Sequence, residues 1–343
     1  MGNDTLFLDF ETQSAIDIKK CGADVYARDS STKVLCCGFA FNEEPAQIAS
    51  ASNIERIKDH LYGGGKVIAH NAHFEWLILN YVWTIPVPIT QFKCTMAMSF
   101  AMSLPGSLEN AAAAVGLDSQ KDLKGRRVML QLSTPKPDGT FWRQDEVPEK
   151  FKQLFEYCKT DVEVERKLFK KLLPLSKSEE ELWFLDHTIN QRGVKTNQKA
   201  LATAQSLLEE RKQILDKRIR KLTSNQVASC SAVSQLTDWL KDQGVECDGV
   251  AKADLDSLLK QKDLSPVVRE VLEIRRSAAK SSTAKISSLI LGADKDERIR
   301  GLFQYHGAAT GRWAGRRTQL QNLPRSKISH EQLEGFFKML EGF

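Results

Sequence analysis

Acidic side chains at separate points of the sequence could together hold metal ions. Asp9 and Glu11 stand two residues apart in an otherwise apolar segment. Side chains alternate across a β-strand, so this spacing would place both carboxylates on one face of a strand. Burying two anions in apolar surroundings is costly unless a cation neutralises them. The pair therefore indicates a metal site, with a pair at the surface edge of a sheet as the alternative.

A further acid, Glu75, lies where a predicted strand passes into a helix, in the run HNAHFE of residues 70–75. One interpretation makes His70, His73 and Glu75 ligands of zinc, although the three histidines that follow show no recognisable ligand spacing. A second interpretation has Asn71 capping the helix while Glu75 pairs with a cation. A third lets Glu75 face the same site as the first two acids.

Tyr157 and Asp161 are four residues apart in a helical segment that begins at Pro148. Residues at this spacing share one face of a helix. A hydroxyl group and a carboxylate held in this way can position a water molecule between them. The alternative is an ordinary pair on a helix surface.

The elements that would position these residues follow from the hydrophobic pattern. Segments rich in β-branched and aromatic residues predict strands at residues 5–10, 34–41 and 67–69. Helical patterns occupy residues 73–82 and the segment after Pro148. Strands that alternate with helices predict an α/β domain with a mixed sheet.

Beyond Pro174 helical periodicity takes over. The segments that carry it are residues 179–191, 198–222, 232–242, 253–260 and 267–291. A third stretch begins near residue 292 with a predicted strand at residues 299–305 and is then rich in Gly, Arg and Gln. The pattern predicts three domains, at residues 1–174, 175–291 and 292–343.

The composition is that of a soluble globular protein, with 343 residues, 41% hydrophobic and 27% charged. Seven cysteines without a Cys-x-x-Cys motif predict reduced, buried thiols. No apolar run approaches the ~20 residues that span a bilayer, and the first residues do not resemble a signal peptide. We therefore expect a protein of the cytoplasm that has no membrane partner.

The net charge of +5 is unevenly distributed. Residues 275–285 hold four cations and no acid, and residues 298–327 hold seven cations and no acid. Clustered positive charge favours a polyanionic partner. For the first cluster, a solvated helix face is the alternative.

The order of the three acidic motifs resembles a known family. Asp-x-Glu on a first strand, Asn-x-x-Phe-acid at a strand-to-helix turn and Tyr-x-x-x-Asp on a late helix are similar to the exonuclease motifs of the DEDD superfamily, tyrosine subtype. The resemblance covers about residues 5–173 and implies a ribonuclease-H-like fold. The family's second motif usually ends in Asp, whereas this chain has Glu75, whose longer side chain would reach a metal directly or through water.

A second resemblance lies near the end of the sequence. The runs YHGAATGRW at residues 305–313 and LQNLPR at residues 320–325 look like segments of family A DNA polymerases of the phage type. Residues 276–285 are similar to the thumb segment that grips primer and template in that family. The resemblances imply an exonuclease domain, a mainly α-helical thumb-like domain and a short, truncated start of the polymerase palm.

These resemblances imply a 3′-5′ DNA exonuclease that releases nucleoside monophosphates with two divalent ions, Mg²⁺ or Mn²⁺. Asp9 would bridge both ions, and Glu11 and Asp161 would complete the ion on the nucleophile side. Glu75 would support the second ion, largely through water. Tyr157 would orient the attacking water.

Candidate DNA-binding residues lie beside the acidic motifs and in the basic stretches. Aromatic stacking and phosphate contacts would bind DNA without reading its sequence. These candidates are Phe10, Thr12, Asn71, Phe74, Lys280, Lys285, Arg312, Arg316, Arg317, Gln321, Asn322 and Arg325. For Phe10, packing in the core is the favoured alternative.

The polymerase motifs that would follow the palm segment in family A are absent from residues 326–343, so the chain by itself is expected not to polymerise. We expect single-stranded or primer-template DNA as the partner, with a separate polymerase chain as a further candidate. One alternative is an impaired module that only holds DNA. Another is an RNA-trimming exonuclease of the same superfamily.

Overall fold

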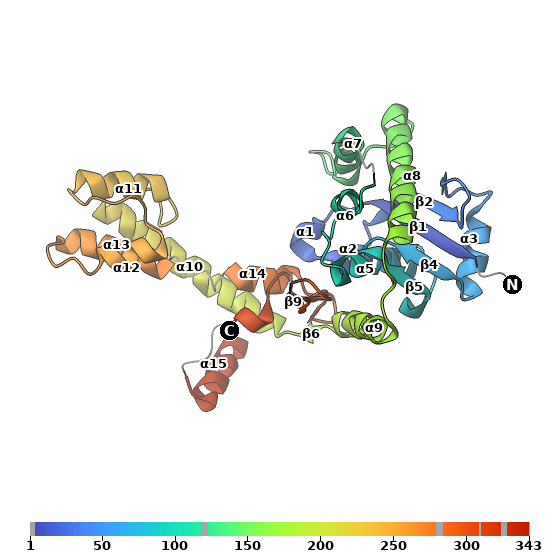
Figure 1. Ribbon diagram of the computed structural model, residues 1–343. Coiled ribbons are helices and arrows are strands. Elements are labelled where there is room, and N and C mark those ends of the chain that lie inside the picture. Colours follow the sequence, from blue (N-terminus) through green and yellow to red (C-terminus); the bar gives the residue numbers. More distant parts are fainter. Residues whose placement is uncertain (1–3, 118–122, 279–283, 309, 324–327, 343) are drawn as a thin grey trace. The chain divides into compact units, whose positions relative to one another are not determined.

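The computed structural model describes residues 4–117, 123–278, 284–308, 310–323 and 328–342 (Figure 1). Contacts within the chain group it into two compact units. The first unit comprises residues 1–196 and 292–321, and the second comprises residues 197–291 and 322–343. The first unit therefore combines the predicted exonuclease region with residues 175–196 and with the first part of the predicted palm-like segment.

A five-stranded mixed sheet lies at the centre of the first unit. Its strand order is β3-β2-β1-β4-β5. The strands are β1 (Thr5–Gln13), β2 (Lys33–Phe41), β3 (Gln47–Ile48), β4 (Lys66–Ala69) and β5 (Phe92–Cys94). β1 is antiparallel to β2 and parallel to β4. The α/β class and the three predicted strands are confirmed, and the two strands that the sequence did not predict are the shortest of the five.

The two faces of β1 bury different residues. Leu6 and Leu8 pack in a hydrophobic cluster with Ile57 and Leu61 of helix α3 (Ile54–Tyr62). Phe7, on the opposite face, packs with Val162 of helix α8 (Pro148–Lys171). The side-chain period of two along a strand therefore places Asp9 and Glu11 on the face that α8 covers.

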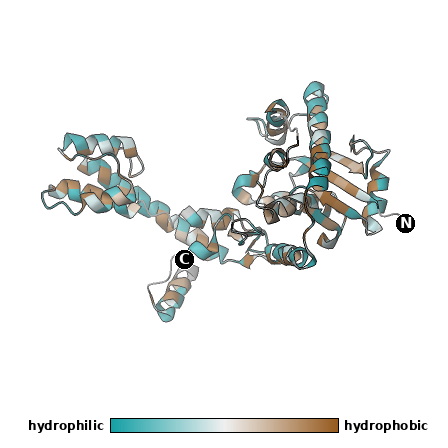
Figure 2. Ribbon diagram, viewed as in Figure 1, coloured by the Kyte–Doolittle hydropathy of each residue, from teal (hydrophilic) through white to brown (hydrophobic). Residues whose placement is uncertain are grey.

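Helix α8 begins at Pro148, as predicted, and runs for 24 residues across the sheet (Figure 1). It contacts β1 and β2 through buried residues that include Phe151, Leu154 and Cys158. The strands are mainly hydrophobic, whereas α8 mixes hydrophilic and hydrophobic residues, as expected for a helix with one buried face (Figure 2).

The turn after β4 leads into α4 (His73–Leu77), which continues as a π-helical segment, η1 (Ile78–Val82). The predicted helix at residues 73–82 is therefore present. Its predicted cap is wrong, because Ala72 occupies the N-cap position and no side chain caps the helix. Asn71 instead has a left-handed backbone conformation, with φ of 67°.

Shorter helices complete the surroundings of the sheet. They are α1 (Ile18–Cys21), α2 (Ala23–Arg28), η2 (Ile89–Gln91), α5 (Thr95–Ala101), α6 (Leu108–Ala114) and α7 (Leu123–Ser133). Of these, α2 contacts α4, and α7 contacts both β1 and α8.

Helix α9 (Lys177–Arg192) anchors the later part of the first unit. The predicted strand at residues 299–305 is instead two short strands, β7 (Arg298–Ile299) and β8 (Phe303–Gln304), which pair with β6 (Val194–Lys195) and β9 (Ala314–Gly315). Gly301 lies between them with φ of 63°, a conformation that interrupts a strand. The side-chain amide of Asn190 donates to the carbonyl of Phe303 at 3.0 Å and accepts from its N–H at 2.9 Å, so α9 holds β8 in place.

The second unit is helical, as predicted. Its helices are α10 (Gln198–Leu222), α11 (Val233–Asp242), α12 (Lys252–Leu258), α13 (Pro266–Ala278), α14 (Ala284–Leu291) and α15 (His330–Gly342). Ile219, Leu236, Leu255 and Val271 are buried in its hydrophobic cluster. The predicted helix at residues 267–291 is described as α13 and α14, and the residues between them lie outside the described ranges.

All seven cysteines are free thiols, and Cys247 is half-buried while the other six are buried. This confirms the prediction of unpaired thiols. Within the described residues, no helix combines the length and the apolar composition that crossing a membrane requires.

Candidate active site

Three carboxylates converge at one point of the first unit. One carboxylate oxygen from each of Asp9, Glu11 and Asp161 lies within 4.8 Å of the other two. Among the described residues, no other group of three or more His, Cys, Asp or Glu side chains comes this close together. We call these residues the three-acid cluster.

The close approach of α8 to the sheet creates this cluster. Asp9 and Glu11 lie on β1, Asp161 lies on α8, and Asp9 is paired in register with Gly38 of β2. A Cβ atom on Gly38 would lie 2.8 Å from the sulfur of Cys158 and 3.0 Å from its carbonyl oxygen. The missing side chain at Gly38 therefore lets α8 come near enough to β1 to join the three acids.

Replacing Gly38 by alanine is accordingly expected to lower the free energy of unfolding by about 1–3 kcal/mol, the usual cost of forcing a methyl group into a packed interior. Gly335 on α15 is a matched control, because a Cβ atom there meets nothing within 4 Å. Gly335→Ala should raise the stability of its helix by up to about 1 kcal/mol. Urea unfolding of the two variants measures both effects, and an unchanged Gly38→Ala protein would contradict the packing argument.

Burial shapes the electrostatics of the cluster. It raises the pKa of Asp9 to about 6, although a hydrogen bond from the Cys158 thiol, with the sulfur 3.3 Å from Oδ2, acts in the opposite direction. Burial also raises the pKa of Glu11 well above its usual value, and the negative charge of Asp9 adds to this effect. Two carboxylates that are costly to ionise become stable anions when a cation lies between them.

Tyr157 belongs to the same group. Its hydroxyl donates a hydrogen bond to the carboxylate of Asp161. Burial first, and then the charges of Asp161 and Glu11, raise the pKa of the phenol far above its ordinary value. Tyr157 therefore stays neutral and can orient a water molecule without acting as a base.

Glu75 lies close to the cluster but outside it. The residue is only 3% exposed, and its Oε2 has no hydrogen-bond partner. Burial, followed by the charge of Asp9, raises its pKa well above the usual value. A buried carboxylate oxygen without a hydrogen-bond partner near Asp9 is suited to support a cation, and this role of Glu75 stays a prediction, because Glu75 is not one of the three converging ligands.

The sequence reasoning missed one further acid, Glu165. It lies one helical turn beyond Asp161 on α8, is 1% exposed, and accepts a hydrogen bond from the backbone N–H of His70. Its Oε1 has no hydrogen-bond partner, and burial together with the charge of Glu75 raises its pKa. The i,i+4 spacing from Asp161 was the available signal.

The donor set fits hard divalent cations. Carboxylate oxygens suit Mg²⁺ and Mn²⁺, and two unpartnered buried oxygens, on Glu75 and Glu165, would be relieved by positive charge nearby. Asp9, Glu11 and Asp161 are the residues that could ligate such ions directly.

The zinc interpretation is wrong. Nδ1 and Nε2 of His70 lie 2.9 Å from the hydroxyl of Thr95 and from the carbonyl of Gly106, and burial lowers the pKa of His70 to about 4. His73 instead lies 3.1 Å from His187. Both histidines are therefore engaged in separate hydrogen-bond networks.

Two predicted DNA contacts are buried. The ring of Phe10 makes an edge contact with Trp83, with centroids 4.7 Å apart, inside the hydrophobic core. The hydroxyl of Thr12 lies 2.8 Å from that of Tyr26. The position of Phe10 agrees with packing in the core, the favoured alternative, and DNA contacts of Phe10 and Thr12 stay predictions. Phe74 is half-buried and also packs near Tyr26.

The basic candidates of the first unit differ in exposure. Arg312 and Arg316 are exposed, whereas Arg317 donates to the carbonyl of Lys20 at 3.0 Å, and burial lowers its pKa. Gln321 packs its side chain against Gly315.

The remaining candidates lie in the second unit or outside the described residues. Nζ of Lys285 donates to the carbonyl of Asn322 at 3.0 Å in the second unit. Lys280 and Arg325 are outside the described residues.

Known proteins resemble the chain as follows. No protein-family model matches it. It is 33% identical over 353 residues to a DNA polymerase of Bacillus phage SP02, and the match covers 98% of this chain and 54% of that polymerase. Its fold resembles the POL domain of Pol1 from M. smegmatis in complex with DNA primer-template and dNTP, with a TM-score of 0.55, 15% identity, and coverage of 94% of this chain and 53% of that one. The chain thus spans about half the length of each of these two proteins. It is similar in sequence to a phage DNA polymerase and shares its fold with a polymerase domain.

Proposed function

We propose that the chain is the 3′-5′ exonuclease part of a phage-type DNA polymerase, built on a ribonuclease-H-like α/β domain of the DEDD superfamily. The observation that carries this proposal is the convergence of Asp9, Glu11 and Asp161 from β1 and α8 within 4.8 Å, with Tyr157 hydrogen-bonded to Asp161. The similarity to a phage DNA polymerase supports DNA as the substrate.

Asp9, Glu11 and Asp161 would hold Mg²⁺ or Mn²⁺ in this function. When bound there, such ions would lower the pKa of a nearby water and would offset negative charge on the departing oxygen. Glu75, whose carboxyl group is buried near Asp9, would support the second ion, largely through water. The neutral hydroxyl of Tyr157, anchored on Asp161, would orient the attacking water toward the terminal phosphodiester.

Single-stranded or primer-template DNA would bind along exposed basic residues such as Arg312 and Arg316, and the helical second unit would act as a thumb-like clamp. A separate polymerase chain is a further candidate partner.

One observation favours a second candidate function. Glu75 stands outside the three-acid cluster, so a chain with only three ligands could hold DNA without cutting it. That protein would bind primer-template DNA as an inactive module.

The test is a 5′-labelled single-stranded DNA oligonucleotide incubated with Mg²⁺ or Mn²⁺. The proposal expects a ladder of products shortened from the 3′ end, abolished by chelation and by Asp9→Ala. Asp145→Ala is the control, because Asp145 is an exposed acid paired with Arg143 away from the cluster. Binding without a ladder in either metal would favour the inactive module, and faster cutting of an RNA oligonucleotide would favour RNA trimming.

A further inference from the structure

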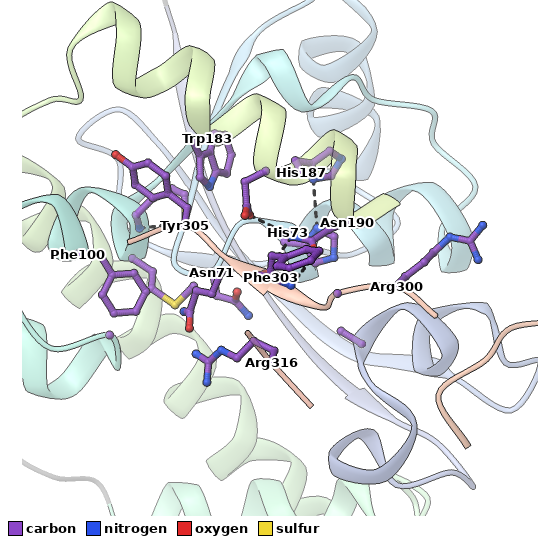
Figure 3. Close-up of a pocket in the computed structure, with 18 of the residues that line it drawn as sticks. Asn71, His73, Phe100, Trp183, His187, Asn190, Arg300, Phe303, Tyr305 and Arg316 are labelled. Atoms are coloured by element: carbon purple, nitrogen blue, oxygen red, sulfur yellow. Dashed lines mark hydrogen bonds between the residues drawn. The ribbon is translucent and has the colours of Figure 1, made fainter. Parts of the chain in front are cut away.

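A cavity of about 410 Å³ lies in the first unit beside the turn that leads from β4 into α4 (Figure 3). His70 and Asn71 of this turn line the cavity, whereas no member of the three-acid cluster does. Its volume is within the range of about 300–1,000 Å³ that is typical of small-ligand sites. The cavity is therefore a neighbour of the proposed catalytic site and is separate from it.

Two polar side chains on the cavity wall have no partner among the residues that the structure describes. Arg316 is exposed, and its guanidinium makes no hydrogen bond or ion pair with any residue that the structure describes. Its backbone is fixed, because its N–H donates to the carbonyl of Leu302 at 2.7 Å. The side-chain amide of Asn71 is equally without a described partner, at the end of a turn with a left-handed backbone. Both groups are thus available to a ligand.

An aromatic ring stands beside them. Phe100 of α5 is half-buried and lines the cavity, and a Cβ atom on Gly106 would lie 2.4 Å from the tip of its ring. Gly106 therefore braces one edge of the ring. Figure 3 shows that the cavity wall combines the Phe100 ring, the Asn71 amide and the Arg316 side chain. This set matches a flat aromatic ligand that carries an anionic group.

Acidic residues lie on the α2 and α9 walls of the cavity. Burial alone would raise the pKa of Asp24, but hydrogen bonds from His73 and Gln191 lower it, so this carboxylate is an engaged anion. Asp186 is 8% exposed, and its Oδ2 accepts from Asn190 at 3.1 Å, while its Oδ1 has no hydrogen-bond partner. This carboxylate oxygen can accept a hydrogen bond from an N–H group of a ligand in the cavity.

We propose that this cavity binds one nucleotide, with its phosphate on Arg316, its base against Phe100, and its polar edge on Asn71 and Asp186. The proposal rests on the nuclease function above, because the His70–Asn71 turn that lines the cavity also leads to Glu75. A nucleotide of this kind could belong to the DNA strand whose 3′ end is being cut, or be a free mononucleotide. Both sources share the same chemistry.

The test uses binding, so that it does not depend on hydrolysis. Fluorescence anisotropy with a labelled single-stranded oligonucleotide, in the presence of a chelator, compares the full chain with Arg316→Gln, Arg316→Lys and Phe100→Leu. We expect Arg316→Gln to weaken binding about tenfold and to lower the slope of log affinity against log salt by about 0.7, the value for one phosphate on a single strand. Arg316→Lys should restore the slope, because it keeps the charge.

Arg143→Gln is the matched control, since Arg143 is an exposed arginine that lines no part of the cavity. Competition by free deoxyadenosine monophosphate separates the two sources. Displacement from the wild type but not from Arg316→Gln indicates a mononucleotide site, and no displacement indicates a unit of the bound strand.

Wild-type affinity and salt slope in both Arg316→Gln and Phe100→Leu would overturn the subsite. The nuclease proposal fails separately, if the wild type produces no product ladder with either metal. Since Arg316 is exposed, its variants are expected to fold normally, and their thermal unfolding should match that of Arg143→Gln.

Discussion

Replacing Asp161 by alanine is expected to lower the rate of 3′-end hydrolysis by about 100-fold or more while the protein stays folded. Asp161 supplies one of the three carboxylates that converge among the described residues, so its loss removes a candidate metal ligand and also the acceptor that holds the Tyr157 hydroxyl. Displacing catalytic groups by about 1 Å can already cost a factor of about 100. Alanine is the best helix former, so α8 itself should be retained.

Tyr157→Phe separates positioning from metal binding. It keeps the ring and removes only the hydroxyl, so we expect a smaller loss of rate, about tenfold, with an unchanged requirement for metal. Glu156→Ala is the control variant, because Glu156 is an acid on the same helix that pairs with Lys159 at the surface. Single-turnover rates on a labelled oligonucleotide test all three variants. An Asp161→Ala enzyme that keeps more than about a tenth of the wild-type rate would show that Asp161 is not a ligand.

The second large expected effect is a change in the stability of the folded protein with pH and with bound metal. Burial raises the pKa of Asp9 from 3.8 to about 6, so the folded protein holds this proton more tightly than the unfolded chain. The contribution of Asp9 to stability is therefore complete below about pH 4 and is lost as the pH rises through about 6. A shift of this size corresponds to up to about 3 kcal/mol. Metal-free protein should accordingly be less stable at about pH 7.5 than at about pH 5.

Divalent metal should reverse this loss at the higher pH. An ion present at 100 times its Kd stabilises the folded state by about 2.7 kcal/mol, and protonation of Asp9 weakens its binding at the lower pH. Asp9→Asn removes the ionisation, so the metal-free variant should be more stable than the wild type at about pH 7.5 and should gain little from metal. Thermal unfolding with Mn²⁺ or with a chelator, at both pH values, measures these differences. An Asp145→Asn control should behave as wild type, and equal stabilisation of Asp9→Asn by metal would place the ion elsewhere.

The sequence predicts the long, strongly periodic elements of the fold well. Residues 198–222 form α10 with the predicted bounds, and Pro148 begins α8, because an apolar stripe or a helix-starting proline carries local information. β3 and β5 could not be predicted, since segments of two and three residues show no period. The predicted strand at residues 299–305 breaks at Gly301, and its first half pairs with β6, which lies far away in the sequence, so no local pattern shows that pairing.

The candidate site is likewise predictable where it depends on local patterns and unpredictable where it depends on contacts between distant segments. Alternation along β1 places Asp9 and Glu11 on one face, and it also places Phe10 on the opposite, buried face, in agreement with the alternative of core packing for Phe10. The failed cap at Asn71 follows from its left-handed backbone, which composition does not reveal. The cavity of Figure 3 depends on the contact between α9 and β8, whose residues Asn190 and Phe303 are 113 positions apart, so no local pattern indicates it.

Crystals of the wild-type protein soaked in Mn²⁺, with data collected at the manganese absorption edge, give the most direct test of the central claim. The account predicts an anomalous peak between the carboxylates of Asp9, Glu11 and Asp161 that disappears in Asp9→Asn crystals. Manganese bound elsewhere in the first unit, with these three carboxylates left without an ion at a concentration that supports hydrolysis, would contradict it.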